Sequence, residues 1–74
     1  MIPFKIFKND RFICYGKSAK SFAKVSENIL GIKLDYNGIR KCLIGDIKSY
    51  QGYTFEKILD FKERREVLCK DDSF

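Results

Sequence analysis

Two short helical patterns, separated by a turn of about four residues, constrain the fold of this chain more than any other feature of its sequence. In the first pattern, apolar and small residues recur at spacings of three and four, as they do along one face of an α-helix. Ser18 stands where the N-cap is expected, and the helix is expected to run to about Leu30. Gly31 follows, where a left-handed residue ends many helices. The pattern therefore predicts an amphipathic helix that packs against a core.

The second pattern begins after Asp35, which can cap a helix that runs through about Ile44. Ile39 and Leu43 lie one turn apart and are expected on its buried side. Gly38 lies inside this stretch, where a glycine costs about 1 kcal/mol relative to alanine. Either the packing is close at Gly38, or the helix begins at or after it.

Three short segments rich in aromatic and β-branched residues are predicted strands. Residues 4–8 and 11–15 flank Asn9-Asp10, whose turn chemistry predicts a β-hairpin. Residues 53–58 predict a third strand that can pair with the hairpin. Residues 62–68 have mixed charge and can form a helix.

The predicted fold class is α+β, with a short N-terminal β-hairpin, a helix-turn-helix, a closing β-strand and a C-terminal segment that can be helical. Residues 1–59 are expected to form one module, and residues 60–74 a C-terminal extension that is partly helical or frayed. Alternation along the first strand places Phe4 and Ile6 on one face. The expected shared core consists of Phe22, Ile29, Leu30, Ile39, Leu43 and Phe55.

Positive charge is concentrated in the first part of the chain. The first 55 residues hold ten Lys/Arg against four Asp/Glu, a net charge of +6, whereas the last 19 residues sum to −1. This distribution suits attraction of a polyanion to a shaped surface, and nucleic acid is the first partner to consider. A solvated lysine-rich surface is the plain alternative.

Several classes of site are not expected. Cys14, Cys42 and Cys69 lie far apart, form no CxxC pair and have no histidine in the chain to complete a metal site, so we expect reduced thiols in a cytoplasmic protein. The acidic residues show no paired catalytic spacing, and no glycine-rich phosphate loop is present, so neither an enzyme nor a cofactor is expected. No membrane span or cleaved leader is expected.

The second helix carries the candidate site. Once Ile39 and Leu43 are turned inward, its polar residues are left on the outside. An asparagine can pair bidentately with adenine, and an arginine with guanine. The candidate DNA-binding residues of this helix are Tyr36, Asn37, Arg40 and Lys41. Ordinary solvent-facing residues are the alternative interpretation.

The loop that follows this helix can hold the DNA backbone. Lys48, Ser49 and Tyr50 can donate hydrogen bonds to phosphate oxygens, and Gly52 lets the backbone approach closely. We expect phosphate contact here, because the loop directly follows the proposed recognition helix. A turn that is merely rich in polar residues is the alternative.

Six short stretches, in their order and spacing, resemble the nuclease-associated modular DNA-binding domains that occur beside homing endonuclease catalytic domains and in small phage proteins. The stretches read K-I-F-K-N-D, K-S, L-G-I, I-R-K-C-L-I-G, K-S and G-Y-T-F, at residues 5–10, 17–18, 30–32, 39–45, 48–49 and 52–55. The resemblance implies a small protein that binds double-stranded DNA with its second helix in the major groove, as a phage-type regulatory factor would. The chain carries no nuclease module, so the resemblance implies binding and not cutting. The first helix is a little longer than in that family, and Gly38 replaces a better helix former.

A protein-interaction module that binds and inhibits a host protein is the rival interpretation. Tyrosine and arginine also anchor protein interfaces, so Tyr36, Tyr50 and Arg40 would suit that role as well. Binding to DNA weakens steeply with added salt, whereas a mainly apolar protein interface does not. A third alternative is a homodimer in which residues 63–68 pair with their copy, which would add a second DNA half-site.

Overall fold

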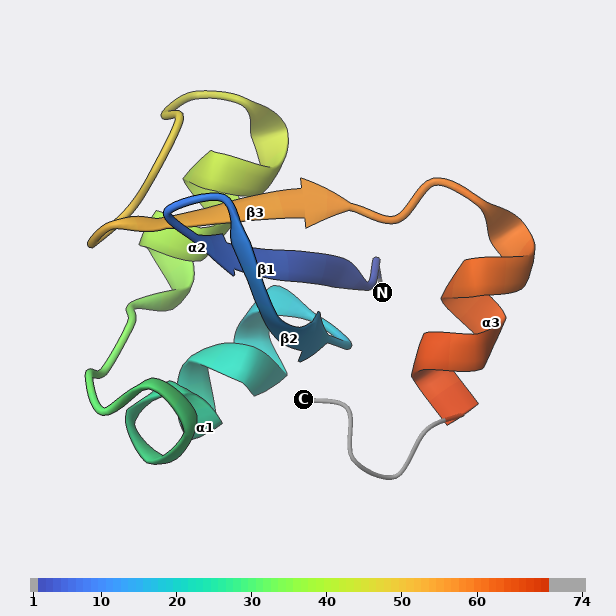
Figure 1. Cartoon of the computed structure of the whole chain (residues 1–74), viewed down its shortest axis with the longest axis horizontal. Coiled ribbons are helices and arrows are strands. Elements are labelled where there is room, and N and C mark those ends of the chain that lie inside the picture. Colours follow the sequence, from blue (N-terminus) through green and yellow to red (C-terminus); the bar gives the residue numbers. More distant parts are fainter. Residues whose placement is uncertain (1, 70–74) are drawn as a thin grey trace.

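A computed structural model describes residues 2–69 of the chain and shows the α+β fold expected from the sequence (Figure 1). The elements follow the predicted order of hairpin, two helices, closing strand and C-terminal helix. Their bounds are β1 (Phe4–Lys8), β2 (Arg11–Gly16), α1 (Ala19–Leu30), α2 (Tyr36–Ile44), β3 (Tyr53–Lys57) and α3 (Phe61–Cys69).

The strands form one antiparallel sheet in the order β2-β1-β3, with β1 in the middle. Asn9 and Asp10 form the hairpin turn with φ angles of 53° and 63°, the conformation of the type I′ turn that matches the twist of the flanking strands. Ile6 lies opposite Cys14 on one side and Phe55 on the other, so these three side chains share the inner face of the sheet. The predicted pairing of the third strand with the hairpin is confirmed.

The core lies between this inner face and the two helices. Phe22 and Ile39 are buried at its centre as expected, and the other four expected core residues are partly buried and pack against it. The sequence-based core prediction omitted four residues of the buried cluster at the centre of the core. Three of them come from the strands, because β1 is the central strand and both helices cover its inner face. The omitted residues are Phe4, Ile6, Leu34 and Tyr53.

Local capping sets both ends of α1 as predicted. The Ser21 amide donates a hydrogen bond to Ser18 Oγ at 3.2 Å, which satisfies one of the unpaired amides of the first turn. Gly31 ends the helix with φ 79°, and its amide donates to the Glu27 carbonyl. Asp35 occupies the N-cap position of α2 in an extended conformation, without a capping bond from its side chain.

A buried serine fixes the turn between the helices. Ser26 is fully buried on the inner side of α1, and its Oγ accepts a hydrogen bond from the Leu34 amide at 2.8 Å while donating to the Ala23 carbonyl at 3.0 Å. Because Leu34 itself is buried, its amide has no access to water, and the serine hydroxyl supplies the partner it needs. One polar side chain thus ties the turn to α1.

The last helix lies apart from the other two. Figure 1 shows α3 at one side of the molecule, with α1 and α2 at the other. Val67 is the buried residue of α3, Lys5 Nζ lies 3.1 Å from Glu63 Oε1, and Asp60 Oδ1 accepts a hydrogen bond from the Glu63 amide at 2.9 Å. Within residues 2–69, no helix combines the length and the apolar character that crossing a membrane requires.

The hydrogen bond from the Leu34 amide to Ser26 Oγ leads to a prediction about stability. We expect Ser26→Ala to lower the free energy of unfolding by about 1–3 kcal/mol, because the buried Leu34 amide then loses its partner. Ser21→Ala on the same helix is the control, because it removes only exposed hydrogen bonds of the Ser21 hydroxyl to Ser18 and leaves no buried group without a partner, so it should cost less. Urea unfolding followed by circular dichroism measures both. Equal losses for the two variants would show that the bond to Leu34 does not stabilise the turn.

Candidate nucleic-acid interface

The buried residues of α2 show which side of the helix packs against the rest of the protein. Gly38, Ile39 and Cys42 are the buried residues of the helix, and they lie within about one third of its circumference. This side contacts both α1 and β3. The opposite side of α2 therefore faces outward along its whole length.

The outward side of α2 gathers the residues expected there. Asn37, Arg40 and Lys41 are exposed and lie on one face, since residues three and four apart are neighbours on a helix. Tyr36 is 42% exposed and lies at the border of this face, at the start of the helix. The structure thus brings together the four residues that the sequence predicts on α2. We call the outward face of Asn37, Arg40, Lys41 and Ile44 the α2 face.

Ile44 is the member of the α2 face that sequence reasoning missed. It is 52% exposed, at the end of the helix, and seven residues after Asn37. A spacing of seven returns to the same side of a helix, so the signal was present in the pattern. Ile44 adds an apolar side chain to the side of the helix that carries Asn37 and Arg40.

The loop after α2 divides into an exposed part and an anchored part. Lys48 and Ser49 are exposed. Tyr50 and Tyr53 exchange backbone hydrogen bonds of 2.9 Å in each direction, around a two-residue turn in which Gln51 and Gly52 have φ angles of 54° and 83°. The loop is therefore a second tight hairpin that leads directly into β3.

Tyr50 packs against the helix rather than lying free in the loop. Its side chain is half-buried, and its hydroxyl accepts a hydrogen bond of 3.3 Å from the Asp35 amide. A Cβ atom on Gly38 would lie only 2.5 Å from a carbon of the Tyr50 ring, so the close-packing alternative for Gly38 is the correct one. Tyr50 therefore positions the first turn of α2. Its predicted contact with phosphate stays a prediction.

A second basic surface lies beside the start of α2. Lys20 and Lys24 of α1 and Lys33 of the turn border a hollow of about 360 Å³ that also reaches Tyr36. The fold brings them together next to the α2 face, although a carboxylate, Asp35, lies in the same hollow.

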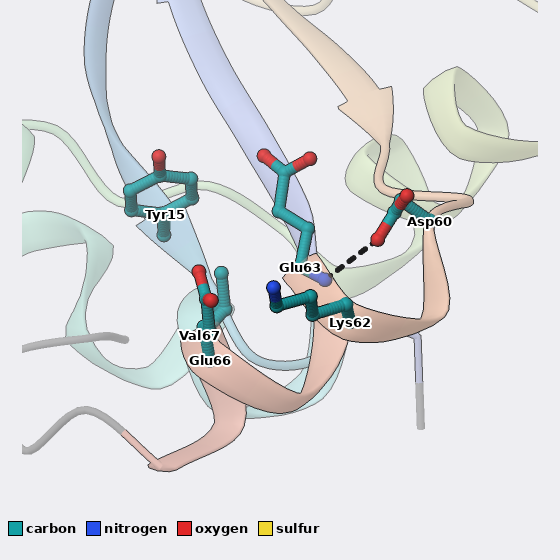
Figure 2. A pocket seen from close by; sticks show the side chains of 6 residues that line it. All are labelled: Tyr15, Asp60, Lys62, Glu63, Glu66 and Val67. Carbon is teal, nitrogen blue, oxygen red and sulfur yellow. Dashed lines mark hydrogen bonds between the residues drawn. The ribbon is translucent and has the colours of Figure 1, made fainter.

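Another hollow of about 360 Å³ lies between β2 and α3 and has a different character. Figure 2 shows Tyr15 of β2 across from side chains of α3, and three of the lining residues are carboxylates, together with Lys62. Asp60 caps α3 and Glu63 is paired with Lys5, so two of the three carboxylates have structural partners. The mixed charge of this hollow does not favour a polyanion.

The cysteines are free thiols. Burial raises the pKa of the Cys14 and Cys42 thiols, which disfavours their thiolate forms, and Cys69 is exposed. In the part of the chain that the structure describes, no three His, Cys, Asp or Glu side chains are grouped so that they could hold a metal ion.

Comparisons with family models, with curated proteins and with solved structures find no match to this chain. The resemblance to nuclease-associated DNA-binding modules therefore stays a prediction from the sequence. The assignment of this interface depends on the geometry and charge of the residues described above.

The contact between Tyr50 and Gly38 leads to a double-mutant test. Gly38→Ala should destabilise the protein by about 1–3 kcal/mol, because the added methyl group overlaps the Tyr50 ring. In a Tyr50→Ala background, the same change should instead stabilise by up to about 1 kcal/mol, since alanine is the better helix former. Thermal and urea unfolding of the four proteins measure the coupling. Stabilisation by Gly38→Ala in both backgrounds would show that the ring does not pack there.

Proposed function

We propose that this protein binds double-stranded DNA and inserts the α2 face into the major groove. The observation that carries the proposal is the separation of α2 into a buried side and an outward side on which Asn37, Arg40, Lys41 and Ile44 lie together. The helix follows α1 after a turn of five residues, 31–35, which is the arrangement that lets a second helix enter the groove while the first crosses the backbone.

The side chains of the α2 face have complementary recognition chemistry. Asn37 can donate one hydrogen bond to the edge of an adenine and accept another from it, and Arg40 can donate two hydrogen bonds to a guanine. Ile44 can contact the methyl group of thymine, which is the apolar feature of the major groove. Lys41 lies beside Arg40 and can reach either a base or a phosphate. A preferred site is therefore expected to combine adenine, guanine and thymine within a few base pairs.

Basic and polar residues flank the α2 face and support contact with phosphates. Lys48 and Ser49 lie in the loop that follows α2, and both are exposed. Lys20, Lys24 and Lys33 lie beside its start. Contacts of this kind hold the duplex and fix the register of the helix without reading the sequence. The net charge of +6 in the first 55 residues supports the same role.

One short helix buries a small interface, at the low end for single DNA-binding modules. Binding by the monomer should accordingly be weak and only modestly sequence-selective. The proposed role is that of a binding factor, with no catalytic step assigned to it. Titration of a random duplex at two salt concentrations gives the primary test. Lysine and arginine side chains that bind phosphates release counterions from the DNA, so the affinity should fall steeply as salt is added.

The proposal separates residues that read bases from residues that hold phosphate. Arg40→Ala and Asn37→Ala should each cost about 1–3 kcal/mol on a selected duplex and much less on a scrambled one. Lys48→Ala should weaken binding to both duplexes alike and lower the slope of log affinity against log salt by about one unit. Fluorescence anisotropy at several salt concentrations measures both effects.

Matched controls make this test specific. Lys62→Ala removes the same charge from the exposed surface of α3 and should leave DNA affinity nearly unchanged. Equal losses on both duplexes for Arg40→Ala would show that α2 is not the reading element. An affinity that neither responds to salt nor changes with Arg40 or Lys48 would favour the protein-interaction alternative.

A further inference from the structure

An exposed apolar surface lies on α3, away from the α2 face. Leu59 and Phe61 are 75% and 74% exposed, the highest values among the exposed large hydrophobic side chains of residues 2–69, and Leu68 is 38% exposed. Isolated exposed apolar residues are ordinary, but these lie on and next to one helix. Figure 1 shows this helix at the side of the molecule opposite α1 and α2.

Phe61 and Leu68 border one shallow hollow of the surface. Phe61, Arg64, Arg65, Leu68 and Cys69 surround a hollow of about 310 Å³ along the outer side of α3. Their spacing of three, four and seven residues defines one stripe of the helix. The opposite side of α3 contacts the body of the protein through the buried Val67 and through the pair of Glu63 with Lys5. We call the outer stripe the α3 groove.

The two sides of α3 differ in charge. The α3 groove contains two arginines and no carboxylate, whereas Glu63 and Glu66 both line the hollow on the other side, as Figure 2 shows. Within residues 2–69, no carboxylate lies within ion-pairing distance of Arg64 or Arg65. The α3 groove thus combines the apolar side chains of Phe61 and Leu68 with two cationic side chains.

Both arginines are held in place by neutral contacts. Arg64 Nε donates a hydrogen bond to the Ile58 carbonyl, and the guanidinium of Arg65 lies 5.7 Å from the centre of the Phe61 ring. These contacts reduce the conformational freedom that the side chains would lose on binding, while both positive charges stay uncompensated by other described residues. Such groups are suited to carboxylates of a partner.

We infer that the α3 groove binds an acidic amphipathic helix of a partner protein, with apolar side chains between Phe61 and Leu68 and carboxylates against Arg64 and Arg65. A helix laid in a groove presents anchors at the same spacings of three, four and seven residues. A second copy of the chain fits less well, because a two-fold pairing of α3 with itself would bring arginine stripes together. Since the groove lies away from the α2 face, this function is independent of DNA binding.

A synthetic peptide tests the inference on the full chain. The probe is a labelled helical peptide with Leu at positions i, i+3, i+4 and i+7 and Glu at the flanking positions. Its control carries Lys in place of each Glu. We expect the Glu peptide to bind at least about tenfold more tightly than the Lys peptide, and Arg65→Glu or Phe61→Ser to weaken its binding by at least about tenfold. Both substituted residues are exposed or half-exposed at the surface, so unfolding temperature, measured in parallel, should change little.

Two further measurements localise the peptide. Lys20→Glu on α1 makes the same charge change as Arg65→Glu and should alter peptide affinity by less than about twofold. Cys69 lines the groove and is the exposed cysteine, so saturating Glu peptide should slow its alkylation by iodoacetamide. The half-buried Cys14 and the buried Cys42, whose pKa values are raised by burial, react slowly and should not change.

Several outcomes would overturn the inference. Equal affinity for the Glu and Lys peptides would show that the two arginines do not select carboxylates. Equal losses of affinity for Lys20→Glu and Arg65→Glu would show general electrostatic attraction without docking in the α3 groove. Tighter binding to anionic phospholipid vesicles than to the Glu peptide, abolished by Phe61→Ser, would assign the face to a membrane surface. A concentration-dependent dimer in sedimentation equilibrium, lost in Phe61→Ser, would assign it to a second copy.

Discussion

The close approach of the Tyr50 ring to Gly38 determines how α2 is presented. Gly38 has no side chain, so the ring can lie against the helix backbone, and the tyrosine hydroxyl reaches the amide of Asp35 just before the helix begins. The backbone pairing of Tyr50 with Tyr53 connects this contact directly to β3. A helix of nine residues has little intrinsic stability in water, so its orientation must come from contacts of this kind. The outward direction of Asn37 and Arg40 therefore depends on packing at the opposite side of the helix.

Local signals made the elements predictable. Ser18 and Gly31 bound α1 where capping chemistry places them, and Asn9-Asp10 forms the turn expected of that pair. Leu34 and Tyr53 were not predicted in the core, because their burial depends on how separate elements meet rather than on spacing within one element. For the same reason, the sequence could not decide whether the packing is close at Gly38 or the helix begins at or after it. The residue that decides between them, Tyr50, lies in a different segment, and helix propensity carries no information about it.

The candidate interface was predictable to a similar extent. Helical periodicity alone places Asn37, Arg40 and Lys41 together, and it also contained the signal for Ile44, which was interpreted only as the end of the helix. Lys33 and the lysines of α1 could not be assigned to the same surface, because their proximity arises from the path of the turn back along α1. Tyr50 was expected to contact phosphate on the basis of its residue type, and that contact stays a prediction. Its packing against Gly38 was not expected, because it arises from tertiary structure.

The central position of β1 has a consequence for how the chain folds as it is made. The first strand pairs with residues 53–57, which are separated from it by the hairpin partner and both helices. During synthesis, the hairpin and α1 can form early, but Tyr50, Tyr53 and β3 become available only when most of the chain has left the ribosome. Until then, one edge of β1 and the inner side of α2 stay uncovered. Pairing over such a long sequence separation is slow relative to local structure, so the last strand to be synthesised is expected to limit the rate at which the protein reaches its native state.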